Sequence, residues 1–187
     1  MRWSNLPAPI SEFEPQPAVD REKLARDVAF VVRCSGAATL SYLLAQAVGL
    51  PHPVWAAMSG IIVGQERLDA TRQATIGRIL GTVLGITIAV GMSALTRPFG
   101  ADIALQIALS VGLAAVAARR YPLIRVCMWT CPIVFLTATP GTPYLLVGFY
   151  RGSEVLLGGA LGALLHVIAE VAIKRVFPNE SKTGFQQ

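Results

Sequence analysis

Apolar residues in this chain form long runs separated by short polar or proline-containing segments. The runs cover residues 28–50, 52–64, 76–95, 101–118, 123–138 and 144–176. A helix needs roughly 20 apolar residues to cross about 30 Å of hydrocarbon, which four of the runs approach or exceed. We therefore predict an all-α integral membrane protein with six transmembrane helices, of which the second and fifth are short.

Polar segments set the limits of these helices. Asp20 is placed to cap the first helix, and residues 65–75 are polar enough for a short interfacial helix or a turn. Residues 20–176 are predicted to form the transmembrane module, with cytoplasmic tails at 1–19 and 177–187. The first tail is expected to be disordered, and it lacks the apolar stretch of a signal peptide.

The composition supports lipid as the main solvent of this chain. Hydrophobic residues make up 53% of the sequence and charged residues 14%, against about 25% charged in an ordinary soluble domain. So small a chain cannot bury that much apolar sequence inside itself. The net charge is +5, but no basic run or basic–aromatic patch is present, so we expect membrane lipid and not nucleic acid as a partner.

The distribution of positive charge predicts the orientation. With six spans and both termini on one side, that side collects fourteen of the sixteen Lys and Arg residues, and only Arg97 and Arg151 fall on the other. Positive residues stay on the cytoplasmic side. We therefore expect both termini in the cytoplasm and a multi-pass protein in a bacterial-type inner (plasma) membrane.

The two halves of the chain resemble each other. A short apolar run, a linker and LGTVLG (80–85) are matched by a short apolar run, a linker and LGGALG (157–162). A unit of three spans places its second copy upside down in the bilayer. We therefore predict two inverted three-helix repeats, a plan common in transporters, whose path lies near the repeat interface.

Glycines spaced by four mark both of these helices. They are Gly77, Gly81 and Gly85 in the first half, and Gly158 and Gly162 in the second. Glycine at such spacing lets another helix approach closely. We expect these residues to pack helices, and packing alone is a sufficient reason for them.

Charged or titratable residues inside spans are costly and usually face a bundle interior or a water-filled path. Arg78 suits either an interfacial anchor or an anion site, and Arg151 suits a second anion contact. Glu154 is a candidate for proton coupling, although Arg151 and Glu154 could instead form an intrahelical pair. His166 could carry protons or simply pack. Three residues near span ends are expected to snorkel: Arg33, Arg125 and Glu170.

Trp55 and Trp129 lie in the two short runs. Trp55 could anchor at the membrane interface, a role that fits Trp129 less well, and either could form an apolar wall for a flat ring. The chain shows no phosphate-binding glycine loop, nucleophile elbow or metal-ligand spacing. We expect no enzyme activity, no metal and no cofactor.

The stretch HPVWAAMSGIIVGQERLDATRQATIGRILGTVLG (52–85) resembles the fusaric acid resistance family, also called the aromatic acid exporters. The resemblance is carried by a proline–aromatic start, a linker with spaced arginines and an Arg-x-x-Gly-Thr-x-x-Gly helix entry. The matching positions are Pro53, Trp55, Arg78, Gly81, Thr82 and Gly85. The segment FYRGSEVLLGGALGALLHVI (149–168) resembles the second glycine-rich helix of that family. The module is also similar to the membrane part of aluminium-activated malate transporters.

The resemblance implies a six-helix module that exports small organic anions, aromatic carboxylic acids above all. Arg78 and Arg151 would then hold the carboxylate, Trp55 and Trp129 would wall the ring, and Glu154, with His166, would couple protons. Longer members carry a cytosolic domain that these residues lack, so we expect a homo-oligomer. A passive anion channel and a non-transporting membrane scaffold or subunit are the alternatives.

Overall fold

The computed structural model describes residues 21–65 and 67–176, and this part of the chain is all-helical, as predicted. The predicted tails at 1–19 and 177–187, and the cap Asp20, lie outside the described residues. The helices are α1 (Arg21–Ala47), α2 (Pro53–Val63), α3 (Leu68–Thr96), α4 (Ile103–Arg120), α5 (Cys127–Leu136) and α6 (Tyr144–Val176), with short 3₁₀ turns η1 (Arg97–Phe99) and η2 (Pro122–Ile124).

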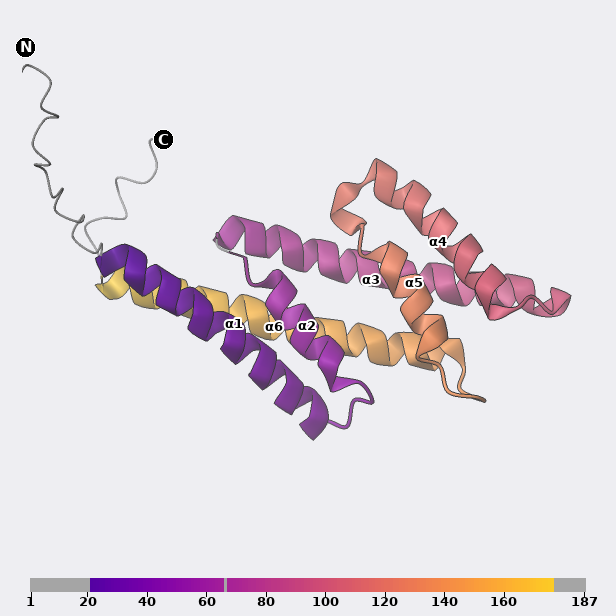
Figure 1. Cartoon of the computed structure of the whole chain (residues 1–187), viewed down its shortest axis with the longest axis horizontal. Helices are drawn as coiled ribbons and strands as arrows, with labels where there is room; N and C mark the ends of the chain where they lie inside the picture. The colour runs from indigo at the N-terminus through magenta and orange to yellow at the C-terminus, as the bar shows by residue number, and fades with distance from the viewer. Residues whose placement is uncertain (1–20, 66, 177–187) are drawn as a thin grey trace, which may run out of the picture.

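Four helices, α1, α3, α4 and α6, are long and apolar enough to cross a membrane, whereas α2 and α5 are shorter. Successive helices run in alternate directions, so that α1 starts and α6 ends at the same end of the molecule (Figure 1). One detail differs from the prediction. Residues 68–75 are not a separate element but the first two turns of α3, which begins at Leu68 directly after its N-cap Arg67.

Local sequence explains where the short elements begin and end. Pro53 starts α2, since proline fits the first turn of a helix, and Gly64 caps its end. Asp102 caps α4 by accepting a 2.7 Å hydrogen bond from the backbone N–H of Leu105. Pro132 lies inside α5, where it removes one backbone hydrogen bond. These residues set the boundaries of the helices that surround the site.

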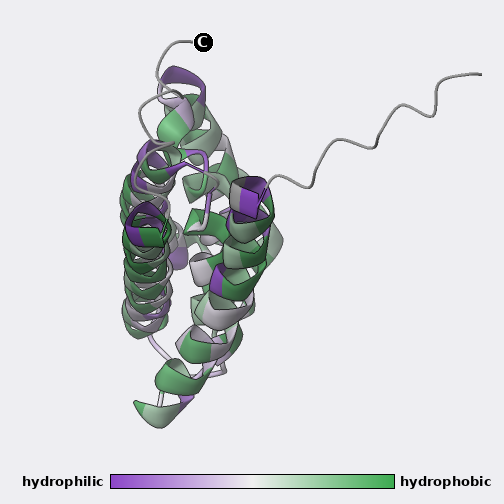
Figure 2. Cartoon of the chain, turned by 90° about the vertical axis from the view of Figure 1, so that its left-hand side faces the viewer, coloured by the Kyte–Doolittle hydropathy of each residue, from purple (hydrophilic) through white to green (hydrophobic). Residues whose placement is uncertain are grey.

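The outside of the bundle is more apolar than much of its inside. Large hydrophobic side chains such as Val31, Val83 and Val116 are exposed. Green hydrophobic segments make up much of the long helices, with white and purple ones between them (Figure 2). A small apolar core lies among α3, α4, α5 and the start of α6. Elsewhere the interior holds polar and charged side chains, the arrangement expected where lipid solvates the exterior.

Each short helix packs against a long helix of the other half of the chain. Helix α2 lies against α6 as well as against its neighbour α1, and α5 lies against α3 as well as against α4. Helices α3 and α6 also pack against each other and run in opposite directions through the middle of the molecule (Figure 1). The site described next lies where α2, α3 and α6 meet.

Candidate functional site

Glycines on α6 bring α2 into backbone contact. A Cβ atom added at Gly158 would overlap the carbonyl oxygen of Ala56, and one at Gly162 would lie 2.5 Å from the carbonyl oxygen of Gly60. Only glycine allows the two helices to approach this closely. The contact holds the face of α2 that carries Ser59 close to α6.

Glycines on α3 do the same for the other short helix. A Cβ at Gly77 would overlap the carbonyl oxygen of Leu123, and one at Gly81 would lie 2.9 Å from that of Ile124. At Gly85, an added Cβ would lie 2.6 Å from the Cβ of Thr130 on α5. The face of α3 that carries these glycines is therefore filled by η2 and α5, and Arg78 projects elsewhere.

Arg78 lies in the interior and reaches toward α2. Its side chain is buried, and its Nε and Nη2 atoms donate hydrogen bonds of 3.4 and 3.2 Å to the hydroxyl of Ser59. Ser59 donates in turn to the carbonyl oxygen of Trp55, at 2.8 Å. The guanidinium therefore has a neutral partner and no acidic one among its hydrogen bonds.

Arg151 on α6 lies near Arg78 in the interior of the bundle. Its guanidinium stands over the indole ring of Trp55, with 4.2 Å between its central carbon and the ring centroid. The residue is 3% exposed, and its buried Nε and Nη1 atoms have no hydrogen-bond partner in the described part of the chain. Cation–π contact offsets part of the cost of burying this charge. Arg78 is close enough to repel this positive charge, and Glu154 is close enough to attract it.

Glu154 is buried one turn further along α6. Its Oε1 atom accepts a 3.0 Å hydrogen bond from the backbone N–H of His52, the residue before α2. Sequence reasoning allowed an intrahelical pair between Arg151 and Glu154; the hydrogen bond that the structure gives this carboxylate goes to the backbone of His52. The carboxylate thus links α6 to the start of α2.

A cavity of about 260 Å³ opens beside these groups, at the end of the molecule opposite to the start of α1. Arg151, Glu154 and Trp55 line it together with His52 and Tyr150. Threonine side chains from the segment between α5 and α6 complete its wall. The cavity combines a buried cation, a carboxylate and an aromatic face within one space.

His166 lies two turns beyond Gly158 on α6 and belongs to a different cluster. Its Nδ1 atom shares a hydrogen bond with the hydroxyl of Thr71, which also accepts from the backbone N–H of Gln65. Arg33 donates a 2.7 Å bond to the carbonyl oxygen of Gln65. Arg33 was expected to snorkel; instead it is buried and ties α1 to the segment between α2 and α3.

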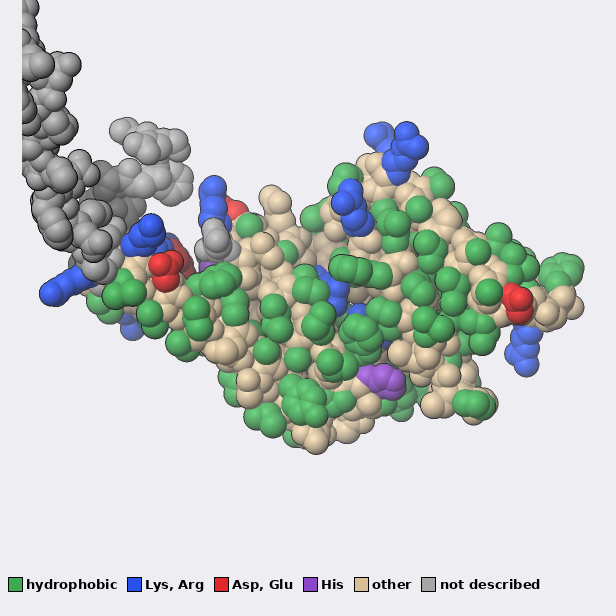
Figure 3. All heavy atoms as spheres, in the orientation of Figure 1, with side chains coloured by type: hydrophobic (Ala, Val, Ile, Leu, Met, Phe, Trp, Pro, Cys, Tyr) green, Lys and Arg blue, Asp and Glu red, His purple; other side chains and the backbone are tan. Residues whose placement is uncertain are grey.

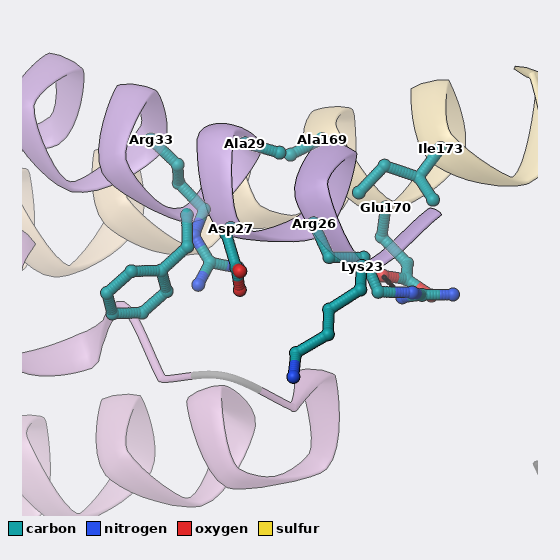
Figure 4. Close-up of a pocket in the computed structure, with 9 residues that line it drawn as sticks. Lys23, Arg26, Asp27, Ala29, Arg33, Ala169, Glu170 and Ile173 are labelled. Carbon is teal, nitrogen blue, oxygen red and sulfur yellow. Dashed lines mark ion pairs between the residues drawn. The ribbon is translucent and has the colours of Figure 1, made fainter. Parts of the chain in front are cut away.

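A second cavity, of about 310 Å³, lies near this cluster at the end where α1 starts and α6 ends (Figure 4). Basic side chains from α1 and the carboxylate of Glu170 on α6 project into it. Glu170 pairs with Arg26 at 3.8 Å and with Lys174 at 3.4 Å. Arg33, a member of the polar cluster with Gln65, Thr71 and His166, also lines this cavity.

Trp129 does not join the other predicted binding residues. It is 54% exposed on α5 and lines a groove between α4 and α5 on the outer face of the bundle. The structure therefore brings Arg78, Arg151, Trp55 and Glu154 together, and leaves Trp129 and His166 in two other places.

Two contributors to the site were missed by sequence reasoning. Ser59 is the one hydroxyl residue of the apolar helix α2, a signal that could have marked it. His52 contributes its backbone N–H to Glu154, and no side-chain pattern predicts a backbone contact of this kind.

A helical bundle with an apolar exterior, long membrane-spanning helices and a buried cationic site in a cavity defines a multi-pass membrane transport protein. Comparison with family models agrees with this class. The model described as fusaric acid resistance protein-like matches residues 40–165, and the chain belongs to that family of membrane transport modules. Searches of curated proteins and of solved structures returned no significant match.

Proposed function

We propose that this module exports small organic anions, aromatic carboxylic acids in particular, and that Arg151 is the principal contact for the carboxylate. The observation that carries this proposal is the pair of buried Arg151 nitrogens without hydrogen-bond partners, beside a cavity that Trp55 also lines. A planar guanidinium can bind a carboxylate through two parallel hydrogen bonds. The indole of Trp55 supplies an apolar face for an aromatic ring.

Arg78 is the second cation of this proposed site. It lies deeper in the interior than the cavity lining and repels Arg151, so an anion between the two would be favoured electrostatically. The hydroxyl of Ser59 holds Arg78 without neutralising it. In this proposal Trp129 has no part in substrate binding, since it lies on the outer face of α5.

The architecture in this proposal is six crossings in two inverted repeats, with both termini cytoplasmic. The packing of the two short helices supports the repeats. Helix α2 of the first half packs against α6 of the second half, and α5 of the second half packs against α3 of the first. The Lys and Arg side chains at the surface in Figure 3 lie mainly in two groups, one on the upper edge where α4 meets α5 and one at the end where α1 starts. That end would be cytoplasmic in an inner membrane, because positive residues stay inside. The cavity beside Arg151 would then open outward. We also propose a homo-oligomer.

Flux through purified protein tests the proposal. When a pH gradient is imposed, proteoliposomes that contain the chain should take up fusaric acid or benzoate faster than empty liposomes, in which only the neutral acid crosses the bilayer. Arg72→Gln is the matched control, because Arg72 is exposed on α3 and lies outside the site. Anion currents that need no gradient would instead identify a passive channel. A protein that moves no anion alone but purifies with a fixed partner would be a scaffold.

Glu154 is the residue that we propose for proton coupling. Glu154→Gln keeps the shape and can still accept the hydrogen bond from His52, but it removes the titratable group. We expect uphill accumulation of benzoate to fall to the level of simple equilibration, while exchange of labelled for unlabelled benzoate continues. Uphill accumulation and exchange are measured in parallel on the same proteoliposomes. Unchanged uphill transport in the variant would exclude a role of Glu154 in proton coupling.

The contrast between the two tryptophans gives a further prediction. Trp55→Leu should weaken binding of an aromatic acid about tenfold, since an aromatic pair contributes up to about 1.5 kcal/mol and tenfold corresponds to about 1.4 kcal/mol. It should affect acetate much less, because acetate has no ring. Trp129→Leu should leave both affinities unchanged. Competition of each acid against labelled benzoate measures these effects, and equal losses for the two variants would contradict the placement of the site.

A further inference from the structure

A groove between α4 and α5 has no role in the proposed transport site. Its volume is about 810 Å³, and most of its lining is apolar, from Val111 and Ala115 on α4 to Met128 and Pro132 on α5. It lies on the outer face of the bundle, where the exposed side chains of both helices meet lipid. The groove is therefore open to the acyl chains of the bilayer.

Two arginines stand at one end of this groove, one from each rim. Arg119 belongs to the last turn of α4, and Arg125 lies between η2 and α5. Both are exposed, and neither guanidinium has a hydrogen bond or an ion pair with any residue that the structure describes. No acidic residue lines the groove. The pair thus offers uncompensated positive charge at the polar end of an apolar channel.

Trp129 forms part of the apolar wall. Its position in the middle of a short span is unusual for an interfacial anchor, and its side chain is 54% exposed beside Met128 and Pro132. A large flat side chain there gives an acyl chain a continuous surface to pack on. The groove accounts for a tryptophan that the transport site leaves unused.

We propose that this groove binds one anionic phospholipid, with the phosphate between Arg119 and Arg125 and an acyl chain along Trp129. Charge complementarity selects this occupant, because a lipid phosphate carries the negative charge that the two guanidiniums lack as a partner. Basic pockets between membrane helices on the cytoplasmic side bind acidic lipid headgroups in this way. In the proposed six-crossing topology, the turn between α4 and α5 that carries these arginines lies on the cytoplasmic side. The inference does not depend on the transported substrate.

The test compares lipid retention by the protein, two groove variants and one control variant. Purified protein in detergent is mixed with phosphatidylglycerol or phosphatidylcholine, and bound lipid is measured by native mass spectrometry. We expect the wild type to retain phosphatidylglycerol, and the double variant Arg119→Gln/Arg125→Gln to bind it about tenfold more weakly. Arg120→Gln is the matched control. It removes a neighbouring exposed arginine that stacks on Tyr121 and does not line the groove.

A second variant separates the lipid from a free anion. Trp129→Ala should weaken the binding of phosphatidylglycerol, whereas a site for phosphate alone would not depend on this ring. Displacement of the lipid by inorganic phosphate at millimolar concentration would overturn the proposal in favour of a simple anion site. Equal losses for the double variant and Arg120→Gln would show that the groove makes no specific contact. A changed oligomeric mass with unchanged lipid retention would assign the groove to a second copy of the chain.

Discussion

Arg151→Gln should lower the affinity for aromatic carboxylates by about ten- to a hundredfold, because a hydrogen bond to a charged group contributes about 1.5–3 kcal/mol. The variant should nevertheless unfold at a similar or higher temperature. In the wild type, two guanidinium nitrogens are buried without a hydrogen-bond partner among the described residues, so removing this charge relieves a desolvation cost. Loss of the contact with Trp55 offsets part of that gain.

Thermal unfolding with and without fusaric acid measures both effects at once. The wild-type protein should unfold at a higher temperature as the acid is added, because a ligand that binds only the folded state stabilises it. Arg151→Gln should lose this shift, and Arg72→Gln should keep it. An Arg151→Gln protein that unfolds at much lower temperature without ligand would mean that Arg151 has a structural partner, and would refute its assignment as the carboxylate contact.

Gly158→Ala is expected to have the largest effect on folding. The added Cβ would overlap the carbonyl oxygen of Ala56, and this atom belongs to the backbone of α2 and cannot rotate away. Helix α2 must then move off α6, which we expect to lower the free energy of unfolding by about 3 kcal/mol. Ser59 moves with α2, so the hydrogen bonds to Arg78 should also lengthen.

Gly91→Ala is the matched control for this substitution. Gly91 also lies inside a long helix, α3, but an added Cβ there would have no other atom within 4 Å. Alanine favours a helix over glycine by up to about 1 kcal/mol, so this variant should be as stable as the wild type or slightly more so. Chemical unfolding in one detergent ranks the three proteins. Similar stabilities for both variants would contradict the close contact between α2 and α6.

Much of the helical framework could be predicted from the sequence, because lipid imposes a simple rule on it. Long apolar runs predicted α1, α3, α4 and α6. Prolines marked the start of α2 and the position in α5 where Pro132 removes one backbone hydrogen bond. The start of α3 was placed too late. The charges in residues 65–75 suggested an interface, while the backbone in fact continues as helix from Leu68.

The residues of the candidate site were easier to predict from the sequence than the contacts that they make. Arg78, Arg151 and Glu154 were identified because charge inside an apolar run is costly, and this argument needs no structure. It could not decide what each charge touches. The pairing of Arg151 with Trp55 depends on how α2 lies across α6, a property of two distant segments. The backbone N–H of His52 and the outward position of Trp129 depend on tertiary packing in the same way.

The shortness of α2 and α5 has a consequence for energetics. Eleven and ten residues span only about 16 and 15 Å at 1.5 Å per residue, half of an ordinary hydrocarbon layer. The two cavities lie toward opposite ends of the molecule, and with water in both, most of the electrical potential across the membrane would fall over the short distance between them. When one negative charge leaves a cell with a negative interior, its free energy falls by about 2.3 kcal/mol per 100 mV. In this arrangement, the membrane voltage would itself help to expel the anion.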